Sequence, residues 1–222
     1  MNDRLNETRT TYRTGFVRAV IDGAAGILLA FVGFAGIFSG LMISAIADRG
    51  VIAQLVTDDT LRSRLLRDAE LVELVYASLF WGGVGIAAAG GLLLVAAVVF
   101  LAVRIRMHRR REFQRSVVAD AVIGAAVTLV TSFVPFSPVI GGLISGHLFD
   151  QGPWQGIRVG IVVGILVAAP VVVIIGFVSA GFAMSGMLLP SLFLLLVGIL
   201  SAGFTVVLGA AGGYLGGSIQ PH

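Results

Sequence analysis

Residues Val159 to His222 read VGIVVGILVAAPVVVIIGFVSAGFAMSGMLLPSLFLLLVGILSAGFTVVLGAAGGYLGGSIQPH, a stretch that contains no Asp, Glu, Lys or Arg. Most of it is Leu, Val, Ile, Ala, Phe and Gly. It is far longer than the roughly 20 apolar residues that cross a bilayer. We therefore expect this part of the chain to lie in lipid.

The composition extends this expectation to the whole chain. Of 222 residues, 57% are hydrophobic and 12% are charged, whereas charged residues make up about a quarter of an ordinary soluble domain. There is no Cys, so disulfides, thiolate metal sites and cysteine nucleophiles are excluded. The basic residues are all Arg, because the chain contains no Lys. The composition predicts an integral membrane protein.

Apolar runs separated by charged links predict an all-α bundle of about five transmembrane helices. None of the runs alternates with a period of two, which excludes a membrane β-barrel. The first run is about twice the length of a signal-peptide core, so we expect it to remain as a span. The predicted spans are residues 19–46, 76–103, 117–148, 157–181 and 188–216.

The distribution of Arg predicts the topology. Residues 1–18 carry four Arg and residues 104–116 carry six, whereas the loop 48–74 carries four Arg among six acids. Because Arg is enriched in cytoplasmic segments, the N-terminus should be cytoplasmic and, with five spans, the C-terminus outside the cell membrane. The predicted parts are a tail (1–18), a first helix pair (19–103), a basic link (104–116) and a three-span Gly-rich module (117–222).

The outer loop is expected to hold an amphipathic helix over residues 58–74. Asp58 and Asp59 can cap it, and apolar residues from Leu61 to Val75 fall on one side. Such a helix can lie on the membrane surface or pack over the ends of the spans.

Charged residues near the predicted span ends have structural and functional interpretations. The link after the second span can fix topology or contact anionic lipid head groups. Arg18 and Asp22 lie four residues apart and can pair at the membrane edge, as Asp120 can with a nearby Arg. Arg158 can join His147 at the outer surface. These charged residues can be interpreted as ion pairs at the membrane edge, or as part of a proton relay or a pH-sensitive gate. The basic cluster comprises Arg104, Arg106, Arg109, Arg110 and Arg111.

An internal parallel repeat is predicted from residues 31–50 and 133–152. Aligning these segments matches Phe31 with Phe133, Gly40 with Gly142 and four further identities up to Asp48 with Asp150, and then Gly50 with Gly152. Two helices separate the copies, so both copies would have the same orientation in the membrane.

The third predicted span contains the sequence Pro135-Phe136-Ser137-Pro138. Two prolines three residues apart remove backbone donors and disfavour helical geometry at the residues before them. As one straight helix, the span would also be about 50 Å long, against a hydrocarbon layer of about 30 Å. We expect a helix break, which is either a structural kink or a site for a solute or ion.

Small residues recur every fourth position in the last three spans, as in a glycine zipper. Each series makes a groove that lets another backbone approach closely. The partner can be a helix of the same chain or of another copy, so intramolecular packing and self-association both remain open. The expected packing residues are Gly142, Gly146, Gly156, Gly160, Gly164, Gly209, Gly213 and Gly217.

The second half of the chain resembles a domain of unknown function from small haloarchaeal membrane proteins. The resemblance covers residues 117–219 and rests on Phe133-Val134-Pro135-Phe136-Ser137-Pro138-Val139-Ile140-Gly141-Gly142, on Pro170, and on Gly212-Gly213-Tyr214-Leu215-Gly216-Gly217. It implies a haloarchaeal three-span module and no particular activity.

No catalytic, cofactor or metal constellation stands out, and we therefore expect no enzyme and no cofactor. The sequence favours a non-enzymatic membrane scaffold or accessory subunit. The expected partners are anionic lipid and either a second copy or a larger membrane complex, and not nucleic acid. The alternative is a small channel or transporter with its site at the broken third helix, where Asp22 and Asp120 would act as gating charges.

Overall fold

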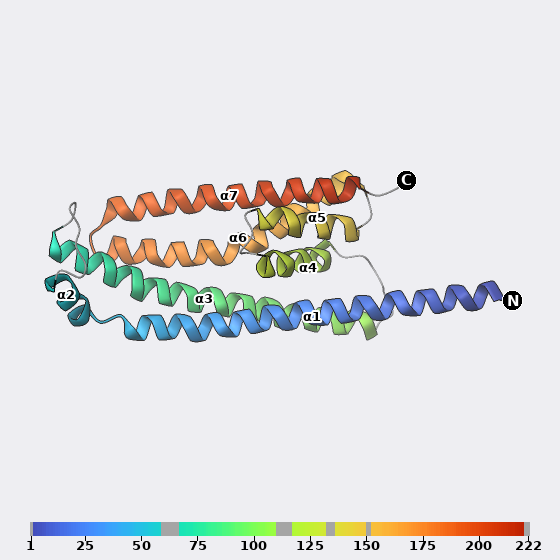
Figure 1. Cartoon of the computed structure of the whole chain (residues 1–222), viewed down its shortest axis with the longest axis horizontal. Coiled ribbons are helices and arrows are strands. Elements are labelled where there is room, and N and C mark those ends of the chain that lie inside the picture. Colours follow the sequence, from blue (N-terminus) through green and yellow to red (C-terminus); the bar gives the residue numbers. More distant parts are fainter. Residues whose placement is uncertain (1, 59–66, 110–116, 132–135, 150–151, 220–222) are drawn as a thin grey trace. The chain divides into compact units, whose positions relative to one another are not determined.

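A computed structural model describes residues 2–58, 67–109, 117–131, 136–149 and 152–219 of the chain. Every regular element in these ranges is an α-helix, so the all-α prediction is confirmed there. Lipid offers no hydrogen-bond partner to the backbone, which explains the exclusive use of helices. They are α1 (Asn2–Ile46), α2 (Arg49–Thr57), α3 (Asp68–Arg109), α4 (Val117–Val130), α5 (Ser137–Phe149), α6 (Pro153–Met184) and α7 (Leu188–Ser218), shown in Figure 1.

Four of the described helices are long and apolar enough to cross a membrane. The spanning segments are Gly23–Ile46 of α1, Asp68–Val103 of α3, Pro153–Met184 of α6 and Leu188–Ser218 of α7. They correspond to the first, second, fourth and fifth predicted spans. The helix α1 begins at Asn2, so the expected tail at residues 1–18 is mostly helical and continuous with the first span.

The expected third span is not a single helix. It consists of α4, with 14 residues, and α5, with 13 residues. Each is about 20 Å long at 1.5 Å per residue, too short to cross a hydrocarbon layer of about 30 Å. Phe136, immediately before α5, has a positive φ of 67°, a backbone geometry that a bulky residue rarely adopts. The break expected from the two prolines therefore separates two helices.

Local sequence explains where α6 begins and ends. Pro153 occupies its first position, where a missing N–H costs nothing, and follows Gly152 with a φ of 86°. At the other end Gly186 has a φ of 78°, and the Met187 N–H donates to the Phe182 carbonyl at 2.8 Å. This is a Schellman termination, which satisfies the last carbonyls of the helix and allows the chain to turn into α7.

The loop between the first two spans contains a short described helix that precedes the predicted range 58–74. It is α2, and its N-cap is Asp48, whose Oδ1 accepts hydrogen bonds from the Gly50 N–H at 2.6 Å and the Val51 N–H at 3.2 Å. Asp58 is the C-cap of α2. Residues 59–66 lie outside the described ranges, and residues 68–74 belong to α3. The Asp48 side chain thus starts α2, and the amphipathic helix expected over residues 58–74 stays a prediction.

The chain divides into two compact units, each made of segments that are distant in sequence. Unit 1 comprises Met1–Phe31, Val95–Leu166 and Val206–His222, and unit 2 comprises Val32–Leu94 and Val167–Thr205. Each long helix contributes to both units. The internal repeat stays a prediction: its first copy lies in α1 and α2, and the described part of its second copy lies mostly in the shorter α5.

Within unit 2, α1 and α3 meet through glycine. A Cβ atom placed on Gly90 would lie 2.6 Å from the carbonyl oxygen of Gly33, and one on Gly83 would lie 2.6 Å from that of Gly40. Real Cβ atoms do not come this close, so the two backbones are in direct contact. Later residues of α1 face earlier residues of α3, which makes the two helices antiparallel.

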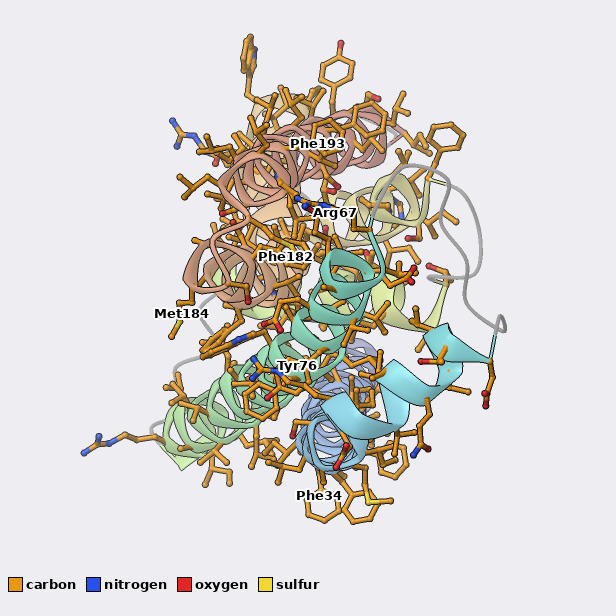
Figure 2. The ribbon with its side chains drawn as sticks, turned by 90° about the vertical axis from the view of Figure 1, so that its left-hand side faces the viewer. Phe34, Arg67, Tyr76, Phe182, Met184 and Phe193 are labelled. Carbon is orange, nitrogen blue, oxygen red and sulfur yellow. The ribbon has the colours of Figure 1, made fainter. Side chains whose placement is uncertain are left out.

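Large apolar side chains on the long helices point outward. In unit 2, Phe34 on α1 and Phe193 on α7 are 65% and 68% exposed, and Figure 2 shows Phe34 directed away from the ribbon. Such an outer surface suits lipid and not water. The described interior of unit 2 combines small residues, such as the fully buried Ala77 of α3, with a few larger ones, such as Phe182 of α6.

The glycine contact between α1 and α3 can be tested by substituting two adjacent glycines of α3. Gly90→Ala should lower the free energy of unfolding by about 1–3 kcal/mol, because its methyl group would force two backbones apart. The measurement is denaturant unfolding in detergent micelles, followed by circular dichroism.

Gly91→Ala is the matched control, because nothing lies within 4 Å of a Cβ atom at Gly91. It should leave stability unchanged or raise it by up to about 1 kcal/mol, since Ala favours a helix more than Gly does. Equal losses in the two variants would contradict the described contact.

Candidate functional site

The predicted glycine grooves meet in unit 1, around the C-terminal half of α7. A Cβ atom on Gly160 of α6 would overlap the carbonyl oxygen of Gly209, and the N and Cα atoms of Gly164 would lie 3.1 and 3.2 Å from a Cβ on Gly209. Because numbers fall along α6 as they rise along α7, the two helices are antiparallel. The facing pairs are Gly160 with Gly209, Gly156 with Gly213, and Gly152 with Gly217.

The same half of α7 packs against α5 on another side. A Cβ atom on Gly142 would overlap the Gly209 carbonyl, and one on Gly146 would overlap the Gly213 carbonyl. Gly209 and Gly213 thus contact both α5 and α6. We call these contacts the glycine seam of α5, α6 and α7.

Sequence reasoning missed two members of the glycine seam. Gly212 faces the backbone of Val139, and Gly216 faces the Leu143 carbonyl and the His147 N–H, the latter 2.9 Å from an added Cβ. The signal was present, because glycine pairs at 212–213 and 216–217 place small residues on two adjacent faces of α7.

The two short helices of the broken span, α4 and α5, also pack through small residues. A Cβ atom on Gly124 would lie 2.7 Å from the Gly141 carbonyl oxygen and 2.9 Å from Cβ of Ser145. Thr128 and Ser145 are fully buried, yet their hydroxyls donate to the Gly124 and Gly142 carbonyls within their own helices, at 2.9 and 3.0 Å. These hydroxyls are satisfied without a partner from another helix.

Among the predicted edge charges whose side chains the structure describes, Asp120 alone lies in the interior of unit 1. It lies in the first turn of α4 and is 3% exposed. An ionisable side chain buried in a membrane helix is costly and is a candidate functional group for that reason. No described His, Asp or Glu residues gather near it as a metal cluster, or anywhere else in the described ranges.

The other predicted site residues are not brought together. Arg158 of α6 and Arg106 of α3 are exposed. Arg18, Asp22, Arg104 and Arg109 lie in helices, but their side chains fall outside the described part of the structure, as do residues Pro135, Arg110 and Arg111 altogether. Pro138 lies in the first turn of α5, where proline is tolerated.

Unit 2 contains a polar cluster that sequence reasoning missed. Glu73 of α3 accepts a hydrogen bond from Arg49 Nη2 at 3.0 Å and another from Ser185 Oγ at 2.9 Å. The Arg49 guanidinium also lies 4.2 Å from the ring centroid of Tyr76, which Figure 2 labels on α3. We call these four residues the outer cluster. It connects α2, α3 and the turn after α6, three segments whose meeting cannot be read from residue spacing.

Aromatic packing continues along α3 from the outer cluster. Tyr76 stacks on Phe80 at 5.7 Å between ring centroids, and Phe80 meets Trp81 edge-on at 5.5 Å. The Trp81 ring fills the space where a Cβ atom of Gly181 in α6 would lie. Tyr and Trp are favoured where a membrane protein meets the lipid head groups.

Comparison with known proteins gives a match to one family model in the second half of the chain, and no activity. Residues 118–219 match the model of DUF5518, a family of unknown function. The matched range contains α4 to α7 and hence the whole glycine seam. The resemblance of the second half to a domain of unknown function is thereby confirmed. No curated protein and no solved structure matches the chain.

The outer cluster can be tested with two neighbouring glutamates. Glu73→Gln removes the ion pair with Arg49, a contact between partly exposed groups worth no more than about 1 kcal/mol. We expect the amides of α2 to exchange with deuterium up to about fivefold faster, as measured by hydrogen exchange and mass spectrometry.

Glu70→Gln is the control, because among the described residues Glu70 pairs with Arg67 alone, at 2.8 Å. It should leave exchange in α2 unchanged. If both variants accelerate exchange in α2 equally, the outer cluster does not hold that helix.

Proposed function

We propose that this protein is a non-enzymatic membrane scaffold or accessory subunit. The observation that carries the proposal is the glycine seam, in which Gly209 and Gly213 of α7 contact both α5 and α6. Close backbone contact of this kind gains van der Waals energy and weak Cα–H···O interactions in lipid, where the hydrophobic effect does not drive helix association. The glycine seam therefore holds α5, α6 and α7 in a closely packed bundle.

The state of the buried hydroxyls supports a structural role. Ser179 of α6 donates to the Ser191 carbonyl at 2.9 Å, and the two Oγ atoms lie 2.8 Å apart. Thr128 and Ser145 bond to the backbone of their own helices. Hydroxyls engaged in this way link or stiffen helices and are poorly placed to act as nucleophiles, which need an adjacent base.

The proposed partners are lipid and protein. The Arg-rich residues 1–18 and 104–116 favour a cytoplasmic N-terminus in the cell membrane and contact with anionic head groups there. The glycine seam is occupied within the chain, so a second copy or a foreign subunit would bind elsewhere. The exposed apolar side of α7, which includes Leu189 and Ile199, offers such a surface.

Native mass spectrometry of the protein purified from its own membranes in mild detergent tests the scaffold proposal. We expect a complex, either of several copies or with a foreign subunit, that survives moderate collisional activation. A monomer alone, over a range of detergents that preserve the helical circular dichroism signal, would contradict the proposal.

A small channel or transporter is the second candidate, and the structure of the broken span is the specific observation that favours it. Two helices replace one crossing, and α4 carries a carboxyl group that is 3% exposed. Broken helices and buried carboxylates both recur in transporters, where they bind or gate ions.

A flux assay in proteoliposomes distinguishes the two candidates. The scaffold proposal predicts no selective ion flux above that of empty vesicles. A selective flux that Asp120→Asn or Pro138→Ala abolishes, and that the exposed control Glu70→Gln leaves intact, would establish the second candidate instead.

A further inference from the structure

The directions of the helices in unit 1 can be read from its contacts, beginning with α1 and α3. A Cβ atom on Gly26 of α1 would lie 2.7 Å from Cγ of Leu101, close to the end of α3. Ala25, beside Gly26, packs in one cluster with Ile123 and Ala126 of α4. The end of α3 and the first half of α4 therefore both lie beside this part of α1.

α5 runs antiparallel to α4. Gly124 faces Ser145, whereas Thr128, one turn later in α4, faces Gly141, one turn earlier in α5. Leu148, at the end of α5, packs against the cluster of Ala25, Ile123 and Ala126. The chain therefore returns along α5 to the region where α4 began. The link between the two helices, residues 131–136, is short, as expected for antiparallel neighbours.

The contacts of the glycine seam also show the direction of α5 relative to α7. Gly212 faces Val139 and Gly216 faces Leu143, so residue numbers rise together and α5 is parallel to α7. α6 is antiparallel to α7, with Gly156 facing Gly213. Hence α5 ends where α7 ends and where α6 begins. This parallel packing agrees with either topology, and the antiparallel packing of α4 and α5 is the contact that excludes a single third crossing.

We infer that α4 and α5 form a re-entrant hairpin, which enters and leaves the membrane on the same side. Both helices are too short to cross the hydrocarbon layer, and their antiparallel packing returns the chain. The membrane is then crossed four times, by α1, α3, α6 and α7. The C-terminus lies on the same side as the N-terminus, whereas five spans would place it on the opposite side.

The Arg distribution agrees with this arrangement. Unit 1 contains residues 1–18 and 104–116, the two segments richest in Arg, together with the ends of α5 and α7. Since such segments remain in the cytoplasm, the start of α6 and the end of α7 are cytoplasmic as well.

Single-cysteine labelling tests the inference in the full chain, which has no native Cys. The variants are Arg106→Cys, His147→Cys, Ser218→Cys and Thr57→Cys, all at exposed positions. A membrane-impermeant maleimide is applied to sealed vesicles of known orientation, and total reactivity is measured after solubilisation. We expect the first three variants to react from one side and Thr57→Cys from the other.

Labelling of His147→Cys and Ser218→Cys from the side of Thr57→Cys would overturn the hairpin and establish a full third crossing. Fusions of the unmodified chain after His222 give a second measurement that does not depend on the variants folding. One fusion carries green fluorescent protein and the other carries alkaline phosphatase. Fluorescence of the first together with inactivity of the second supports a cytoplasmic C-terminus. The reverse pair of results would overturn it.

Discussion

Close contact between helix backbones is the interaction on which the rest of this structure depends. In lipid, an apolar side chain gains little by touching another helix instead of a lipid tail, so helices associate where their backbones can touch. Glycine permits that contact. Gly90 and Gly33 provide it between α1 and α3 in unit 2, and Gly209 and Gly213 provide it between α7 and its neighbours in unit 1. Large side chains are left on the outer surface.

The same constraint explains how the protein accommodates helices that are too short to cross the membrane. Each backbone group must find its partner within the protein, and α4 and α5 satisfy theirs internally except at their ends. The two helices pack on each other, and α5 packs on α7, so both helices have protein neighbours. Polar side chains inside unit 1 follow the same rule, since Thr128 and Ser145 bond to their own helices.

Prediction from the sequence succeeded where the signal is local. Four long helices lie where hydropathy placed them, and the expected third span contains two separate helices, α4 and α5. The sequence did not indicate α2, because Asp48 is one of several possible N-caps in this loop and only the structure shows that it caps a helix. The outer cluster was missed entirely, since Arg49, Glu73 and Ser185 are distant along the chain.

The sequence alone determined that the chain lies in lipid as helices and that glycine lines several of them, because hydropathy and the four-residue period belong to each segment separately. Only the tertiary structure decided which grooves face each other and that α5 runs back along α4. A proline pair ends a helix, but the direction of the next helix depends on the surface against which it packs. Here that surface is the glycine face of α7, and contacts between segments about 70 residues apart are not encoded in any local pattern.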